Sequence, residues 1–116
     1  MKCEKLDVWK KSSRMCANVY RELKNFKDYG FKDQITRSAL SIASNIAEGM
    51  EKESLKEQIR FLEISKGSVA EFITQVYIGI DIKYIQKEIG FEWINTSNHI
   101  LGMLTNLQKN VKAKKD

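Results

Sequence analysis

Apolar residues recur at spacings of three and four along four long stretches of the chain, and no proline interrupts any of them. This period matches the 3.6-residue turn of an α-helix, so each stretch predicts an amphipathic helix. The predicted helices cover residues 6–26, 31–48, 55–83 and 89–111. Short connections between long helices favour an all-α, antiparallel, up-down-up-down four-helix bundle. We expect one domain over residues 1–112 and a basic tail at 113–116.

Three short motifs predict where helices begin and end. The sequence KDYG at 27–30 is typical of a turn. Gly49 is expected to close the second helix in the left-handed conformation. Ser54 and Glu57 have the spacing of a capping box, which would start the third helix near Leu55.

Several classes of protein are excluded by what the sequence lacks. No apolar run approaches the ~20 residues that span a bilayer, and the N-terminal residues contain no signal-peptide core. Cys3 and Cys16 lack metal or redox spacing, so we expect reduced thiols in the cytoplasm, with a structural disulfide as the alternative. His99 is the single histidine, and Glu-x-x-His pairs are absent. We therefore expect no metal and no cofactor.

The stretch SIASNIAEGMEKES, at 41–54, raises the question of catalysis. A serine nucleophile needs an adjacent base, but His99 lies far along the chain and no G-x-S-x-G turn is present. Two interpretations of this polar helix face remain: a solvated surface, or a second packing face. The face consists of Arg37, Ser41, Ser44 and Glu48. The third helix carries a comparable strip of Ser65, Ser68, Phe72 and Gly79. Two helices with extra packing faces would predict self-association.

Positive charge is concentrated at the two ends of the chain. Residues 1–27 hold eight Lys and Arg against three Asp and Glu, and residues 106–116 hold four against one. On the first helix, one arc opposite the apolar stripe carries Lys10, Arg14, Arg21 and Lys24. A second cluster comprises Lys109, Lys112, Lys114 and Lys115. Such an arc is either a solvated helix face or a phosphate-binding stripe. Trp9 and Trp93 are expected to anchor the core or an interface rather than to stack on bases.

Three segments resemble a known bacterial family. These are LDVWKKS (6–12), QITRSALSIASNIAEG (34–49) and SLKEQIRFLEISKGSVAEFITQ (54–75), of which NIAEG (45–49) is the most specific. The chain is similar to the four-helix bundle proteins encoded within intervening sequences of the large-subunit ribosomal RNA gene. The fourth helix matches that family only in pattern.

The resemblance implies a bundle that assembles into a homopentamer and has no established enzymatic activity. A more distant relative, the accessory variability determinant of diversity-generating retroelements, is a basic pentamer that binds nucleic acid and a reverse transcriptase. Within the matching motifs, the resemblance offers no catalytic residues. Contacts within and between subunits are the expected role of Arg37, Ser41, Ser44, Glu48, Gly49, Arg60 and Glu71.

These observations predict a non-enzymatic oligomer that binds RNA or DNA through a basic face with little sequence preference. The same oligomer is also a candidate scaffold for a protein that handles nucleic acid. The alternative interpretation is a structural oligomer whose partner is another protein. We expect it to act in the cytoplasm and not in a membrane.

Overall fold

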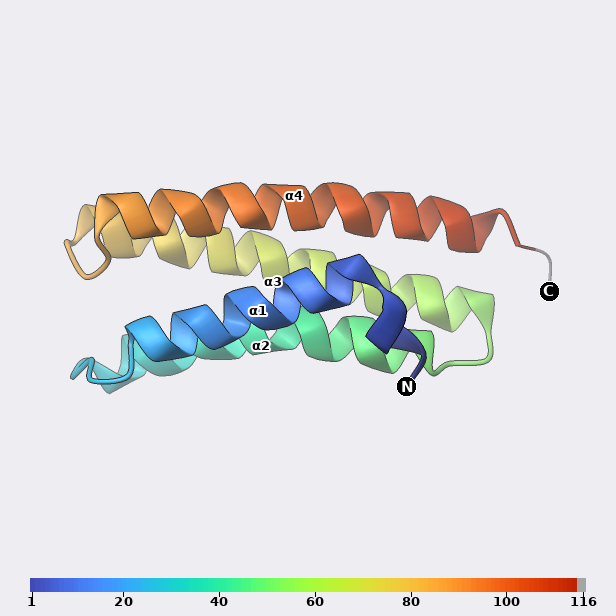
Figure 1. The fold of residues 1–116 in the computed structure, drawn as a ribbon, viewed down its shortest axis with the longest axis horizontal. Helices are drawn as coiled ribbons and strands as arrows, with labels where there is room; N and C mark the ends of the chain where they lie inside the picture. The colour runs from blue at the N-terminus through green and yellow to red at the C-terminus, as the bar shows by residue number, and fades with distance from the viewer. Residues whose placement is uncertain (115–116) are drawn as a thin grey trace.

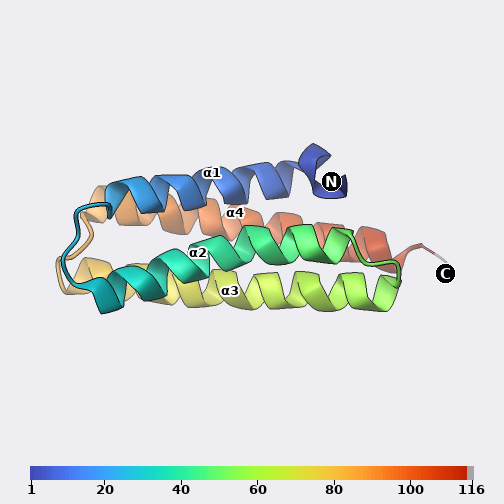
Figure 2. The ribbon, with the colours of Figure 1, turned by 90° about the horizontal axis from the view of Figure 1, so that it is seen from below.

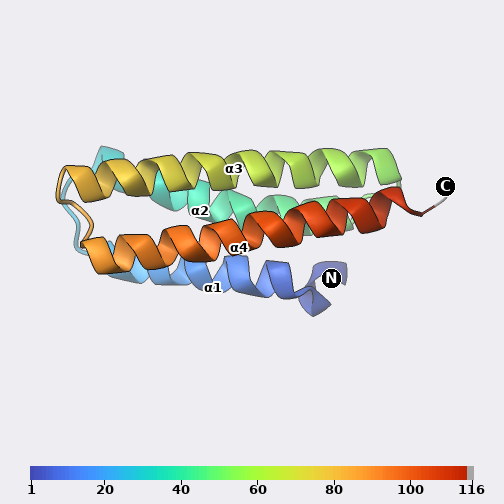
Figure 3. The same cartoon turned by 90° about the horizontal axis from the view of Figure 1, so that it is seen from above.

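A computed structural model describes residues 1–114 of the chain as a bundle of long helices (Figure 1). The elements are η1 (Lys2–Lys5), α1 (Asp7–Glu22), α2 (Tyr29–Met50), α3 (Leu55–Asp81) and α4 (Lys87–Lys112). Successive long helices run in opposite directions, and no strand occurs between residues 1 and 114 (Figures 2 and 3). The predicted all-α four-helix bundle is confirmed. The first helix is shorter than predicted, because it ends at Glu22 instead of continuing to Phe26.

The bundle is a rod of 48 × 20 × 20 Å in which α1 is shorter than the other three long helices. Each helix packs on two neighbours, so that α1 and α3 occupy opposite corners. The α1 helix has 16 residues and α4 has 26. As a result α4 extends past the start of α1, where η1 turns back against α2 (Figures 1 and 2).

The core runs the length of the rod and contains side chains from all four helices. The largest fully buried side chains include Val19, Ile35, Ile42, Ile46, Leu62, Phe72, Ile100 and Leu104. Burying each of these contributes about 1.5–3 kcal/mol of transfer free energy. Trp93 is 3% exposed and Trp9 packs against the core, which confirms both as anchors.

Both cysteines are buried free thiols, as expected, and the alternative of a structural disulfide is not formed. Cys3 lies in η1 and Cys16 in α1. Burial raises the pKa of both thiols above the ordinary value, because a low-polarity environment disfavours the thiolate.

Gly49 allows α2 and α3 to approach closely, and its predicted role as a left-handed cap is wrong. The helix continues through Gly49 to Met50, and no glycine among residues 1–114 has a positive φ. A Cβ atom built on Gly49 would lie 2.8 Å from Cβ of Phe61 in α3. The glycine is therefore needed for interhelical contact, not for backbone conformation.

Serine side chains complete the α2–α3 interface. The Ser65 hydroxyl is fully buried and donates to the carbonyl oxygen of Ile42 at 2.8 Å. Ser41 Oγ and Ser68 Oγ are 2.8 Å apart, and the Asn45 amide donates to Ser41 Oγ at 2.9 Å. Small side chains at these positions let the two backbones come together while their hydroxyls are satisfied.

The strip predicted as a second packing face on α3 lies inside the subunit. Ser65, Phe72 and Gly79 are buried, and a Cβ atom at Gly79 would lie 2.5 Å from Cδ1 of Ile85. The prediction is wrong because helix α2 and the segment before α4 cover the side of α3 that periodicity alone assigned to a neighbouring subunit. This strip gives no support to self-association.

The start of α3 forms half of the predicted capping box. The Ser54 hydroxyl accepts a hydrogen bond from the Glu57 amide at 3.3 Å. The Glu57 carboxylate turns to Arg60 instead, at 2.7 Å from Nε. This hydrogen bond holds the pKa of Glu57 below its ordinary value.

The α1–α2 and α3–α4 connections meet at one end of the rod. Asp28 caps α2 by accepting from the Phe31 amide at 3.2 Å, and its second oxygen accepts from the Tyr84 hydroxyl at 2.8 Å. The Tyr84 ring also packs edge-on against Phe26 and Phe31. Gly30, predicted in the turn, instead lies in the first turn of α2.

Candidate nucleic-acid interface

The outward face of α1 carries cations that have no acidic partner. Arg14 and Arg21 are exposed and Lys10 is half-buried. The ion pairs among residues 1–114 are Met1–Glu4 and Glu57–Arg60, so these three cations have no carboxylate oxygen within 4.0 Å in the described structure. Their charge is therefore available to an anionic ligand.

Lys24 does not belong to the helical arc in which the periodicity placed it. The α1 helix ends at Glu22, and Lys24 lies in the connection that follows. It is exposed, and its carbonyl oxygen accepts a hydrogen bond from Nζ of Lys32 at 3.0 Å. Lys24 and Lys32 therefore add positive charge at the end of α1 rather than along it.

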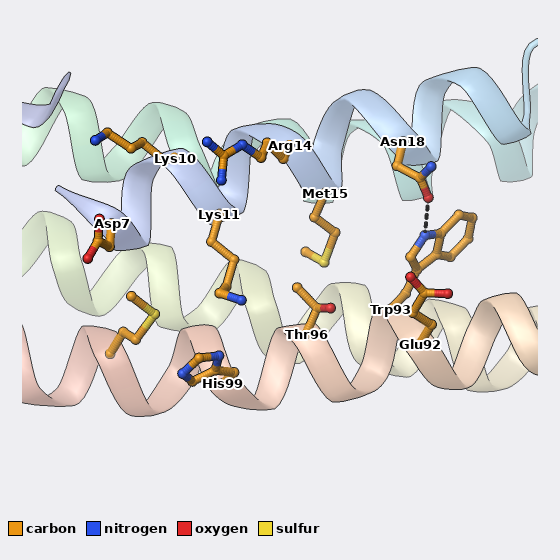
Figure 4. Close-up of a pocket in the computed structure, with 11 residues that line it drawn as sticks. Asp7, Lys10, Lys11, Arg14, Met15, Asn18, Glu92, Trp93, Thr96 and His99 are labelled. Atoms are coloured by element: carbon orange, nitrogen blue, oxygen red, sulfur yellow. Dashed lines mark hydrogen bonds between the residues drawn. The ribbon is translucent and has the colours of Figure 1, made fainter. Parts of the chain in front are cut away.

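A groove of about 720 Å³ separates α1 from α4 on the outside of the bundle (Figure 4). Lys10 and Arg14 from α1 form part of its rim, and Lys11 points across it toward α4. Thr96 and His99 line the opposite wall. The groove is therefore cationic along one wall and bears hydrogen-bonding groups along the other.

Asn18 and Trp93 close one end of this groove. The Trp93 indole nitrogen donates to Oδ1 of Asn18 at 2.8 Å (Figure 4). The Phe72 ring packs against the indole at an angle of 47°, with the two ring centroids 6.2 Å apart. Because Trp93 is held by a hydrogen bond and by the core, it fixes the position of α1 relative to α4.

Lys11, Thr96 and His99 were not predicted as site residues. Lys11 falls outside the arc that contains Lys10 and Arg14, because it lies on the flank of α1 that faces α4. Its proximity to the apolar stripe was the available signal, but which helix packs on that flank is decided by the tertiary structure. His99 is exposed, and no group of three potential metal ligands occurs in residues 1–114.

The C-terminal lysines form a separate cluster. Lys109 and Lys112 are exposed in the last turn of α4, and Lys114 is exposed just beyond it. Lys115 lies outside the described residues. The last turns of α4 and of α1 are at opposite ends of the rod, so Arg21 and Lys24 lie far from the C-terminal cluster (Figure 1). Lys109 and Lys112 also suit the negative end of the helix dipole.

The residues predicted for subunit contacts divide into two groups. Ser41 and Gly49 are engaged within the subunit, and Glu71 accepts a hydrogen bond from Ser38 at 2.8 Å. Arg60 pairs with Glu57, and the nearby charge of Glu48 adds to the rise in the pKa of Arg60. The remaining two, Arg37 and Ser44, are exposed on α2.

An exposed apolar row runs along α3. Ile64, Ile78 and the C-cap residue Ile82 are 40%, 50% and 48% exposed, and their spacing places them on one side of the helix, where Glu71 separates Ile64 from the other two. Isolated apolar residues are common on protein surfaces, but a row along one helix is typical of a face that packs on a partner.

None of the helices described between residues 1 and 114 has an apolar stretch of the length that crossing a membrane requires.

Comparison with known proteins identifies relatives of the whole bundle. The sequence model described as "23S rRNA-intervening sequence protein" matches residues 4–106. A crystal structure of a protein of unknown function, from the S23 ribosomal protein family of Bacteroides thetaiotaomicron, superposes with a TM-score of 0.82. That protein is 25% identical, and the match covers 88% of this chain and 98% of the other. No curated protein sequence matches the chain.

Proposed function

The chain belongs to the 23S rRNA-intervening sequence protein family, and we propose that it is a non-enzymatic, oligomeric protein that binds nucleic acid through the outward face of α1. The observation that carries this proposal is the set of α1 cations without acidic partners in the described structure: Lys10, Arg14 and Arg21. A polyanion that contacts them releases condensed counterions, which supplies affinity without reading sequence.

Charge is the main source of affinity in this proposal. Contacts from lysine and arginine to phosphate carry no sequence information, so binding should depend on salt far more than on sequence. In a homopentamer, as the family resemblance implies, five such faces would raise the affinity by avidity. Free buried thiols support action in the reducing cytoplasm.

The absence of catalysis is also part of the proposal. Ser41 and Ser65 hydrogen-bond to neighbouring groups in the α2–α3 interface, and neither contacts a histidine. Thr96 and His99 lie on one wall of the groove, but no hydrogen bond joins the hydroxyl to the imidazole within residues 1–114, as an activated nucleophile would require.

Salt titration of two matched variants tests the nucleic-acid proposal. Arg14→Gln/Arg21→Gln and Lys56→Gln/Lys87→Gln each remove two exposed cations and lower the net charge from +5 to +3. Affinity for fluorescein-labelled RNA is measured by anisotropy at several salt concentrations. Affinity falls as salt rises, and the α1 variant should make this slope of log affinity against log salt less steep by about 1.4 per bundle. Each lost phosphate contact contributes about 0.7 to the slope for a single strand.

Two results would reject this proposal. One is no RNA or DNA binding by the wild-type protein at low salt. The other is an equal loss of slope in both variants, which would mean that net charge rather than the α1 face determines binding.

Self-association is proposed to bury the apolar row of α3, with Arg37 and Ser44 of α2 at its margin. Ile64→Lys/Ile78→Lys should yield monomers by multi-angle light scattering, while the far-UV circular dichroism spectrum stays unchanged because both side chains are exposed. A wild-type protein that is monomeric at micromolar concentration would contradict this part.

A second candidate function is a scaffold that binds another protein. Two further apolar side chains favour it: Tyr77 and Phe91 are 51% and 44% exposed near the α3–α4 connection, and their ring centroids are 6.3 Å apart. An oligomer that leaves these residues uncovered and binds RNA without salt dependence would support the scaffold over the nucleic-acid protein.

A further inference from the structure

We propose that the groove between α1 and α4 holds a single strand of nucleic acid, with phosphates on the α1 wall and bases on the groove floor. This inference rests on the proposed nucleic-acid function and specifies its ligand and its site. It follows from the arrangement of charge, volume and apolar surface in the groove.

The cations of the groove occupy one wall and the carboxylates only its ends. Lys10 and Arg14 lie four residues apart, which places them about 6 Å apart along the helix axis. Lys11 crosses the groove between the two walls (Figure 4). Asp7 and Glu92 lie at opposite ends of the lining, away from this centre (Figure 4). A flexible phosphodiester backbone can follow such a line of cations.

Three of the residues that line the groove are apolar, and we call them its floor: Met15, Trp93 and the half-buried Met103. Met15 is 5% exposed and Trp93 is 3% exposed. Thioether groups make favourable contacts with flat aromatic rings, so a base can rest on this floor. Above it, the Thr96 hydroxyl, the His99 ring and the free amide nitrogen of Asn18 can bond to base edges or to ribose.

The dimensions favour a single strand over a duplex. The groove lies between two adjacent helices of one bundle, and a duplex keeps its bases stacked inside, so it cannot place a base on the groove floor. A volume of about 720 Å³ falls within the range of sites that enclose small organic ligands, and one or two nucleotides are of that size. An acidic peptide could use the same cations, but the hydroxyl, imidazole and amide groups of the α4 side offer it less than they offer a base and ribose.

Blocking the groove without changing its charge tests the proposal. Thr96→Trp adds bulk inside the groove, and Asn98→Trp adds the same bulk at an exposed position of α4 that does not line it. Anisotropy is measured with labelled oligouridylate, alone and paired with oligoadenylate. Thr96→Trp should weaken single-strand binding by about tenfold, or about 1.4 kcal/mol, because it prevents one base from stacking in the groove, and Asn98→Trp should leave it unchanged.

A second pair of variants serves if Thr96→Trp unfolds. Lys11→Gln preserves the length of a side chain in the groove, and Lys27→Gln removes the same charge from the exposed α1–α2 connection. Lys11→Gln should weaken single-strand binding by about fivefold more than Lys27→Gln, because charge-assisted bonds at an enclosed site exceed exposed ones.

Each outcome bears on one proposal or the other. If Thr96→Trp and Lys11→Gln bind as their controls do, while Arg14→Gln/Arg21→Gln has lost affinity, the groove inference is wrong and the α1 face stands. Duplex binding equal to single-strand binding also overturns the groove inference. If wild-type protein binds polyglutamate but no oligonucleotide, both proposals fail and the ligand is an acidic polypeptide.

Discussion

The α2–α3 and α1–α4 interfaces lie on opposite sides of one bundle and are packed in different ways. Between α2 and α3, Gly49 and Ser65 allow the helices to touch, and the hydroxyl groups bond across the contact. Between α1 and α4, Trp93 and Asn18 join the helices at one end of a groove that Lys11 crosses. Small side chains allow α2 and α3 to pack without a gap. A groove of about 720 Å³, lined by Lys10, Lys11 and Arg14, remains between α1 and α4.

This difference separates stability from binding within a small protein. A close interface leaves no room for a ligand and depends on many small contacts. A wide interface can admit a ligand, but it depends on a few anchors. We therefore expect substitutions in the two interfaces to affect different measurements.

The largest expected effect concerns the anchor of the wide interface. Trp93→Ala should lower the free energy of unfolding by about 3–5 kcal/mol, because it removes a buried indole and leaves a cavity beside Phe72. Phe91→Ala, at an aromatic residue of the same helix that is 44% exposed, should cost less than about 1 kcal/mol. Urea denaturation at a fixed protein concentration measures both. Similar losses for the two variants would show that Trp93 is not the anchor.

Two glycine substitutions test the close interface. They should change the free energy of unfolding by smaller amounts and in opposite directions. Gly49→Ala should destabilise the bundle by about 1–2 kcal/mol, because its Cβ would meet Phe61 at 2.8 Å. Gly67→Ala, in the middle of α3, should stabilise it by about 0.5–1 kcal/mol, since no atom lies within 4 Å of the new methyl group. Chemical denaturation gives both values. A stabilising Gly49→Ala would mean that the helices can move apart without cost.

Two of the three serines in the segment at 34–49, Ser41 and Ser44, should differ in the same assay. Ser41→Ala removes hydrogen bonds to Ser68 and Asn45 and should cost about 1 kcal/mol. Ser44 is exposed, so Ser44→Ala should change the subunit's stability by less than about 0.5 kcal/mol. Light scattering of the same samples separates subunit stability from assembly. Equal costs for both serines, with unchanged assembly, would contradict the assignment of Ser41 to the close interface.

The smallest effect involves the hydrogen bond that links the two connections at the end of the rod. The Tyr84 hydroxyl lowers the pKa of Asp28, and the Asp28 carboxylate raises the pKa of Tyr84. The Asp28 contribution is complete above the unfolded carboxyl pKa of about 3.9 and disappears as the pH falls through the lower folded value. The Tyr84 contribution is complete below about pH 10 and disappears as the pH rises through the higher folded value.

Tyr84→Phe should therefore lower Tm most between about pH 4 and pH 10, with the difference from wild type shrinking on both sides. Thermal unfolding followed by circular dichroism over this range measures it. A Tm difference that does not change with pH would assign the effect of Tyr84 to its ring contacts with Phe26 and Phe31 alone.

Much of the fold could be predicted from periodicity. Apolar spacing located all four helices because the core stripe of each is continuous, as with Ile35, Ile42 and Ile46 in α2. The end of α1 was misplaced because Phe26 continues the apolar spacing, although it packs on Tyr84 outside the helix. Gly49 was misinterpreted because a glycine near a helix end can serve the backbone or a neighbouring helix, and only the position of Phe61 decides between them.

The candidate site was less predictable, because it lies between helices. Lys10, Arg14 and Arg21 could be found from one helix alone, since they share its exposed arc. Lys11 and His99 come together only because α1 lies beside α4 rather than α3. A pattern along one helix does not identify its neighbours.

The alkylation rate of the two buried cysteines can report how often the first helix opens away from the bundle. Cys3 in η1 and Cys16 in α1 both point into the bundle. Burial raises the pKa of both thiols, which favours the protonated, slowly reacting form. An alkylating reagent reaches them only when η1 or α1 lifts from the other three helices. The rate of their modification under native conditions therefore counts how often the cationic helix detaches, with and without a strand bound beside it.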